Sequence, residues 1–294
     1  MKYCLFLYFA LIFLTGCRSE NAPQLREKKF VFIDDLGREV SFDTLPNRII
    51  SMMPSITENI FAIGARDKLI GITTYCNFPP ETKNIQKVGD LNPDYELITA
   101  LNPDLIFIQS STSASPMLNK FTQLGLNVFV ANPTSINEII SHLETLGEIC
   151  GRTENARKLC SDLSDRINFY SSSNGNKKVR AFVILSENPL TTVSGKTFLS
   201  SALELAGFLN IFSGEVNDFP VVSYEDVLKK NPEIIFLPVD SNSSIVPEML
   251  NNLQNSLETT TAVKNKNIKF LNPDVILRST PRLIYEIGEI SSFN

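Results

Sequence analysis

The side chains that most often carry out catalysis or bind metals are scarce in this chain. His142 is the only histidine, so a zinc site built from several imidazoles is excluded, and no Cys-x-x-Cys pair compensates. The Gly-x-Ser-x-Gly turn that exposes a nucleophilic serine is absent. A pair of carboxylates stays open, since the chain has 32 Asp and Glu residues. The sequence therefore favours a binding protein over an enzyme and predicts no metal and no cofactor.

One short segment resembles the end of a phosphate-binding loop. Ser194-Gly195-Lys196-Thr197 has the Gly-Lys-Thr order, but the glycine required five residues before Gly195 is replaced by Leu190. Nucleoside triphosphate binding is therefore not predicted. The net charge of −5 and the lack of a basic stripe also argue against a nucleic-acid partner, because phosphate contacts need clustered Lys and Arg.

Short β-rich runs alternate with helical runs from Arg48 onward, which predicts parallel α/β sheets. In the first half, strands are expected at 48–52, 69–75, 104–109 and 127–131, and helices at 54–65, 94–101, 116–124 and 136–150. In the second half, strands are expected at 179–185, 233–238 and 268–271, and helices at 198–206 and 224–230. Residues 30–42, with Gly37 at the turn, are expected to form a hairpin on the sheet edge.

The two halves contain a repeated unit. The thirteen residues that begin at Tyr95 align without a gap with the thirteen that begin at Tyr224, and six positions are identical. In both copies a helix ends at Asn-Pro and a buried strand follows, as expected when a proline stops the helix. The spacing of 129 residues is far longer than that of solenoid repeats. The repeat therefore predicts two similar Rossmann-like lobes.

One long helix is expected between the lobes. Thr153–Ser171 carries apolar residues at helical spacing and ends in the breaker run 171–176. The predicted organisation is an N-terminal lobe at 30–150, a bridging helix at 151–176 and a C-terminal lobe at 177–294. Two lobes leave a cleft between them, and small-molecule pockets are usually found at such interfaces. The fold is thus expected to be α/β, with a ligand cleft between the lobes.

The N-terminus has the features of an export signal. An apolar run from Tyr3 to Leu14 is too short to span a bilayer and ends in Leu14-Thr15-Gly16-Cys17, which resembles a lipobox. Residues 1–16 are predicted to be removed, Cys17 to carry lipid, and residues 17–29 to form a tether. The protein is expected to be extracytoplasmic and lipid-anchored to a membrane. Such a compartment would permit a Cys150–Cys160 disulfide, which the sequence cannot establish.

Several motifs together resemble class III substrate-binding proteins of ABC importers, which carry cobalamin, ferric siderophores or haem. These motifs are residues 34–40, 48–58, 71–81, 87–89, 192–199 and 277–282. The resemblance covers nearly all of residues 30–290 and implies two lobes bridged by one long helix. The segment from Tyr75 to Pro80 looks most like the cobalamin-binding branch. That branch often has tryptophan in the cleft, whereas this chain has none, and Asp90 stands at the first-lobe position.

The resemblance implies a set of ligand-binding residues in the cleft. They are Ser51, Pro54, Ser55, Tyr75, Asp90, Gly195, Lys196, Phe219, Asp274 and Arg278. Cobalamin is a large, nearly neutral ring rimmed with amides, so aromatic walls such as Tyr75 and Phe219 suit it. Without the resemblance, both aromatic residues could equally be ordinary core.

Other ligands and other classes of protein stay open. An anionic ferric siderophore would need several cations, for which Arg278, Arg282 and Lys196 are candidates, and haem would need an axial ligand such as Tyr75. An extracytoplasmic enzyme on the same scaffold is a more distant alternative, because fold alone does not settle function.

The resemblance also implies a transporter partner. Glutamates at the positions of Glu96 and Glu225 dock onto the two permease subunits in that family, so this protein is expected to act as a monomer on a permease dimer. The plain alternative is that each carboxylate merely stabilises the first turn of its helix.

Overall fold

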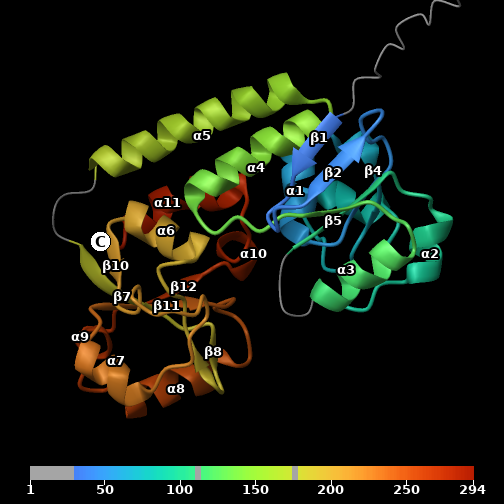
Figure 1. The fold of residues 1–294 in the computed structure, drawn as a ribbon. Coiled ribbons are helices and arrows are strands. Elements are labelled where there is room, and N and C mark those ends of the chain that lie inside the picture. Colours follow the sequence, from blue (N-terminus) through green and yellow to red (C-terminus); the bar gives the residue numbers. More distant parts are fainter. Residues whose placement is uncertain (1–29, 110–113, 174–177) are drawn as a thin grey trace, which may run out of the picture.

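A computed structural model describes residues 30–109, 114–173 and 178–294. The predicted signal peptide, Cys17 and the tether lie outside these residues. Two four-stranded parallel sheets form the centres of two lobes (Figure 1). The first has the order β4 (Leu69–Ile72), β3 (Ile49–Ser51), β5 (Leu105–Ile108) and β6 (Val128–Val130). The second has the order β10 (Phe208–Asn210), β7 (Val179–Val183), β11 (Ile234–Pro238) and β12 (Ile268–Leu271). Each lobe places its second strand, then its first, third and fourth, so the predicted pair of similar α/β lobes is confirmed.

Helices cover both sheets. In the first half they are α1 (Pro54–Ala62), α2 (Tyr95–Ala100), α3 (Ala114–Gln123) and α4 (Ile136–Ile149). In the second half they are α6 (Phe198–Leu205), α7 (Tyr224–Lys230), α8 (Val246–Ser256), α9 (Thr261–Lys264), α10 (Pro273–Ile276) and α11 (Pro281–Ser291). Between the halves lies α5 (Thr153–Ser173). None of the helices in the described ranges is long and apolar enough to cross a membrane.

The repeated unit has the same local structure in both lobes. Helices α2 and α7 are capped by Asp94 and Ser223, whose side chains accept hydrogen bonds from backbone N–H groups in the first turn. Each unit then passes through an asparagine with positive φ, 44° at Asn102 and 43° at Asn231. Asparagine tolerates this left-handed conformation better than most residues, and the proline that follows cannot continue the helix. The Asn-Pro pair therefore turns each chain into its third strand.

The predicted N-terminal hairpin forms from β1 (Phe30–Ile33) and β2 (Glu39–Phe42), which pair antiparallel. It lies beside β6, the edge strand of the first sheet: the Asp35 N–H donates to the Val130 carbonyl at 3.1 Å, and Arg38 donates to the Val128 carbonyl at 3.1 Å. The buried Asp34 carboxylate accepts from the Val130 N–H at 3.2 Å. These bonds satisfy polar groups that an uncovered sheet edge would expose.

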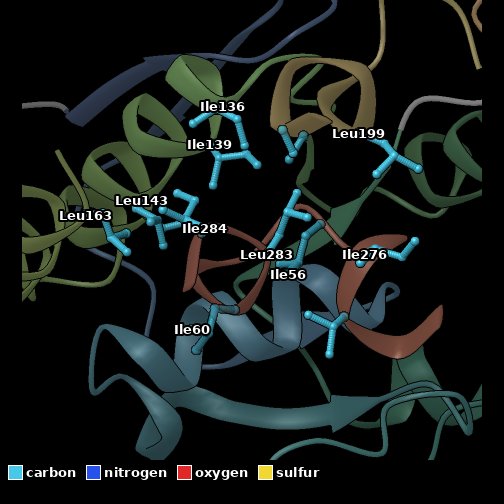
Figure 2. Packing of buried hydrophobic residues seen from close by; sticks show 14 of the residues in the cluster. Ile56, Ile60, Ile136, Ile139, Leu143, Leu163, Leu199, Ile276, Leu283 and Ile284 are labelled. Atoms are coloured by element: carbon cyan, nitrogen blue, oxygen red, sulfur yellow. The ribbon is translucent and has the colours of Figure 1, made fainter. Parts of the chain in front are cut away.

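The two lobes share a hydrophobic core, and each lobe has a smaller hydrophobic cluster of its own. Side chains from α1 and α4 pack in the same interior as those from α6, α10 and α11 (Figure 2). Helix α5 packs against α4, α11 and α6, and adds Leu163 to this core. Its 21 residues correspond to about 30 Å of helix at 1.5 Å per residue. That α5 is the single bridge between the lobes stays a prediction.

The described cysteines, Cys76, Cys150 and Cys160, are buried free thiols. Burial raises the pKa of the Cys150 thiol to about 12 and that of Cys160 to about 11. Both thiols are therefore protonated at neutral pH and are poor nucleophiles. The structure contains no Cys150–Cys160 disulfide.

Candidate ligand-binding site

A cavity of about 580 Å³ lies between the two lobes. Its first-lobe wall is built by segments that follow the carboxyl ends of all four strands of that sheet. After β3 come Met52, Met53 and Pro54, and after β4 come Thr73, Tyr75, Asp90 and Leu91. The last residue of β5, Ile108, and the next residue, Gln109, also line the cavity. After β6 come Asn132, Pro133 and Thr134. Met117 of α3 completes this wall. Carboxyl ends of parallel strands are where open α/β sheets bind ligands, so this location fits a binding site.

The second-lobe wall comes from two loops that lie against each other. One is Lys196, Thr197 and Phe198 at the start of α6, and the other is Asp218 and Phe219 before α7. The Lys196 ammonium donates to the Val216 carbonyl at 2.8 Å, and the Gly195 N–H donates to the Ser213 carbonyl at 3.1 Å. A Cβ at Gly195 would lie 2.6 Å from the Ser213 oxygen, so only glycine allows this approach.

Three aromatic residues line the cavity, and two of them, Tyr75 and Phe219 from opposite lobes, are largely exposed. Tyr75 is 54% exposed and Phe219 is 58% exposed, which excludes the interpretation that they are ordinary core. Leu91, 73% exposed, lies on the same rim. Large apolar side chains left open to solvent around a cavity are typical of a ligand site. Three methionines in the wall add flexible, polarisable surface that adapts to ligand shape.

The cavity carries few charges. Among the described residues that line it, Asp90 and Asp218 are acidic and Lys196 is basic. The Asp90 carboxylate accepts from the Asn92 N–H at 2.8 Å, whereas Lys196 has no carboxylate within ion-pair distance in the described structure. A strongly anionic ligand would therefore find little compensating positive charge here.

The arginines that were candidates for anion binding are already paired. Arg278 donates to the Glu58 carboxylate at 2.6 Å and to Asp274 at 2.5 Å, and Arg282 donates to Glu58 at 3.2 Å. Asn77 bridges Asp274 and Arg278 at 2.9 and 2.8 Å. Neither arginine lines the cavity. This group of residues, the inter-lobe ion cluster, joins α1 and the loop after β4 to the second lobe.

The expected ligand-binding residues therefore divide into two groups. Pro54, Tyr75, Asp90, Lys196 and Phe219 line the cavity, and Gly195 lines a smaller cavity beside it. Ser51, Ser55, Asp274 and Arg278 do not line it. Ser51 is fully buried, where its hydroxyl donates to the Met53 carbonyl and accepts from Thr57. The roles of these four residues as ligand contacts stay predictions. The side chains of Ser51, Asp274 and Arg278 already have protein partners here.

The sole histidine lies away from this cavity. His142, on α4, places Nε2 3.0 Å from the Asp35 carboxylate of the hairpin, so it joins α4 to the hairpin. Burial opposes ionisation of Asp35, but hydrogen bonds from His142 and the Asn132 N–H hold its pKa below the usual value. The described residues contain no cluster of three or more His, Cys, Asp or Glu side chains able to hold a metal ion.

The two expected docking glutamates are exposed on equivalent helices. Glu96 lies in the first turn of α2 and Glu225 in the first turn of α7. Glu225 pairs with Lys229 at 2.9 Å, whereas Glu96 makes no ion pair in the described part of the chain. Each also sits where a carboxylate stabilises the helix dipole, so the geometry fits both interpretations.

Comparison with known proteins gives a consistent result. A family profile described as periplasmic binding protein matches residues 49–275. A vitamin B12-binding protein of Vibrio parahaemolyticus is 30% identical over 83% of this chain and 87% of its own length. An uncharacterized ABC transporter substrate-binding lipoprotein of Bacillus subtilis, YvrC, is 29% identical over 97% of this chain and 94% of its own. The crystal structure of the periplasmic vitamin B12 binding protein BtuF of Vibrio cholerae superimposes with a TM-score of 0.73 at 28% identity, covering 84% of this chain and 96% of that one.

Proposed function

Because this chain belongs to the periplasmic binding protein family, we propose that it captures cobalamin outside the cytoplasm and delivers it to an ABC importer. The observation that carries the proposal is the cavity between the lobes, with Tyr75 and Phe219 as exposed aromatic walls. Among its described lining residues, Lys196 is the one that is basic. Aromatic and apolar surfaces with a few polar groups suit a large macrocycle whose periphery is mostly neutral amides.

The state of the arginines supports cobalamin over an anionic siderophore. Arg278 and Arg282 are held by Glu58 and Asp274, so each would have to leave a carboxylate before it could bind a ligand anion. Breaking a buried ion pair leaves one charge uncompensated, which costs several kcal/mol. A ligand that asks for several cations is therefore the weaker candidate.

Haem is the second candidate, and Tyr75 is the residue that favours it. Its phenol group is exposed in the cavity and has no hydrogen-bond partner in the described structure, so it is free to ligate an iron ion. Tyrosine is an established axial ligand of haem iron.

Titration calorimetry of the soluble form, residues 18–294, distinguishes the ligands. We expect cobalamin to bind at a ratio of one to one with a Kd in the micromolar range or below, which corresponds to about 8 kcal/mol or more of binding free energy. A ferric siderophore and haem serve as comparison ligands in the same buffer. Heat from either of these and none from cobalamin would contradict the proposal. Failure of all three to bind would reopen the alternative of an enzyme on this scaffold.

We also propose that lipid on Cys17 holds the protein at a membrane surface. The support is the lipobox-like Leu14-Thr15-Gly16-Cys17 and the similarity to a relative named as a lipoprotein. Each CH₂ of an acyl chain that is buried in the membrane contributes about 0.8 kcal/mol to membrane binding.

Replacing Cys17 should release the protein. In fractionated cells we expect the Cys17→Ala variant to move from the membrane pellet to the soluble or secreted fraction, because it lacks the thiol that lipid modifies. The matched control is Cys4→Ala, which changes a cysteine within the predicted signal peptide and should leave the protein in the membrane fraction. If a Cys17→Ala form that has lost residues 1–16 stays with the membrane, the anchor is not at this residue.

A further inference from the structure

A second, smaller cavity adjoins the ligand cavity. It has a volume of about 280 Å³ and shares Thr134 and Lys196 with the larger one. Its walls come from the start of α4, from α6, and from β10 with the residues after it. Besides the two shared residues they are Ser135, Gly195, Ser200, Ser201, Glu204, Phe208, Leu209, Asn210 and Ser213. We name this the side cavity.

The side cavity is rich in hydrogen-bond donors that the protein leaves unused. Ser135 accepts from the Glu138 N–H at 3.2 Å, Ser200 from the Asn210 amide at 3.1 Å, and Ser201 from the Ile136 N–H at 3.4 Å. A hydroxyl has one donor as well as its acceptor sites, and none of these three has a protein acceptor in the described structure. Ser200 is 6% exposed, so water can satisfy its O–H only from within the cavity.

Lys196 adds positive charge at the junction of the two cavities. Its ammonium group has three donors, of which one is used on the Val216 carbonyl. The acidic residue of the side cavity, Glu204, pairs with Lys178 at 2.5 Å, so its charge is already compensated from outside. The lining therefore offers several donors, one uncompensated cation and no uncompensated anion among its described residues.

A group that accepts hydrogen bonds and carries about one negative charge is the natural partner for such a lining. A phosphodiester fits, because its oxygens are acceptors only and it is a monoanion at neutral pH. Charge-assisted hydrogen bonds from Lys196 and hydroxyl groups are the strong kind. The Ser194–Thr197 segment lacks the glycine of a nucleotide loop, but in the fold its last residue caps α6 and brings Lys196 to this position.

We propose that the side cavity is a subsite for the phosphodiester of the nucleotide arm of a corrinoid whose ring occupies the larger cavity. The inference rests on the proposed function, since it assigns a second part of the same ligand. It explains why a cavity with few charges has an unpaired lysine at one end. It also predicts that the chain distinguishes complete from incomplete corrinoids.

The test compares cobalamin with cobinamide, the corrinoid that lacks the nucleotide arm and its phosphodiester. Affinities of both are measured by calorimetry on the full chain purified in detergent. The wild type should prefer cobalamin. In Lys196→Met the ratio of the two affinities should fall by about tenfold, as expected for loss of a charged hydrogen bond. Ser201→Ala should lower the ratio by a smaller factor. Lys196→Arg keeps the charge, so its ratio should be close to that of the wild type.

The control variant is Lys229→Met, which removes an exposed lysine on α7 that does not line either cavity and should leave the ratio as in the wild type. Because the readout is a ratio, a general loss of folded protein affects both ligands and does not imitate the result. An unchanged ratio in Lys196→Met would overturn the subsite while leaving corrinoid capture intact. Failure of the wild type to bind either corrinoid would overturn the proposed function, and the subsite with it.

Discussion

Replacing Glu96 and Glu225 together by alanine should reduce uptake by about 100-fold at limiting ligand while leaving ligand affinity unchanged. Both side chains are exposed, and neither lines the ligand cavity. If each docks on one permease subunit, the second contact is intramolecular once the first is made, and linked weak contacts multiply. Accumulation of labelled cobalamin by cells, with calorimetry on the purified variant, measures both quantities.

The single variants should differ from each other. Glu225 forms an ion pair with Lys229 at 2.9 Å, so its negative charge is partly compensated, whereas Glu96 has no such partner in the described structure. Glu96→Ala should therefore impair uptake more than Glu225→Ala. Glu154→Ala on α5 is the matched control, because that glutamate is also exposed but lies on neither repeated helix. Normal uptake by the double variant would leave the helix dipole as a sufficient explanation of both glutamates.

The second large effect is expected at Glu58, in the inter-lobe ion cluster. Its side chain is 3% exposed and accepts from Arg278 at 2.6 Å and from Arg282 at 3.2 Å. Without Glu58, Arg282 has no carboxylate partner in the described structure and Arg278 keeps only Asp274. Removal of one member of a buried ion pair typically costs about 3–5 kcal/mol of unfolding free energy. We therefore expect Glu58→Ala to lower stability by about this amount in urea unfolding followed by circular dichroism.

The control for Glu58 is an ion pair that is exposed. Arg152 donates to Asp67 at 2.9 Å, but the Asp67 side chain is 63% exposed, so Asp67→Ala should cost at most about 1 kcal/mol. Glu58→Gln keeps the shape and one acceptor and should fall between the two. Equal losses for Glu58→Ala and Asp67→Ala would show that the inter-lobe ion cluster contributes no more than a surface pair.

Much of the fold could be predicted because local signals coincide with element boundaries. The expected helix at 224–230 and strand at 268–271 match α7 and β12 residue for residue. The bounds of α7 could be predicted because a serine caps its start and an Asn-Pro pair ends it. The strand β10 was not predicted, because a strand of three residues is too short to show alternation. The helices α8 and α11 were also not predicted, although α11 supplies four fully buried residues to the shared core.

The site was less predictable, because its properties depend on residues far apart in the sequence. Arg278 is a free cation by sequence alone, and only the fold shows that Glu58 and Asn77, about 200 residues earlier, engage it. Met52, Met53, Leu91 and Met117 were not expected in the wall, since apolar residues near strand ends are usually core. Tyr75 and Phe219 could be identified because of the resemblance to a family, not because of their spacing.

The shared core also limits how proteins of this kind can be recombined during evolution. The two lobes have the same strand order, yet α1 and α4 bury their side chains against α6, α10 and α11 of the other half. A lobe taken from a relative about 30% identical would bring apolar side chains of different shape to that junction, and protein interiors tolerate such mismatches poorly. The lobes are thus copies in topology but not exchangeable modules. New specificities should arise through the loops at the strand ends, which can change while the junction stays the same.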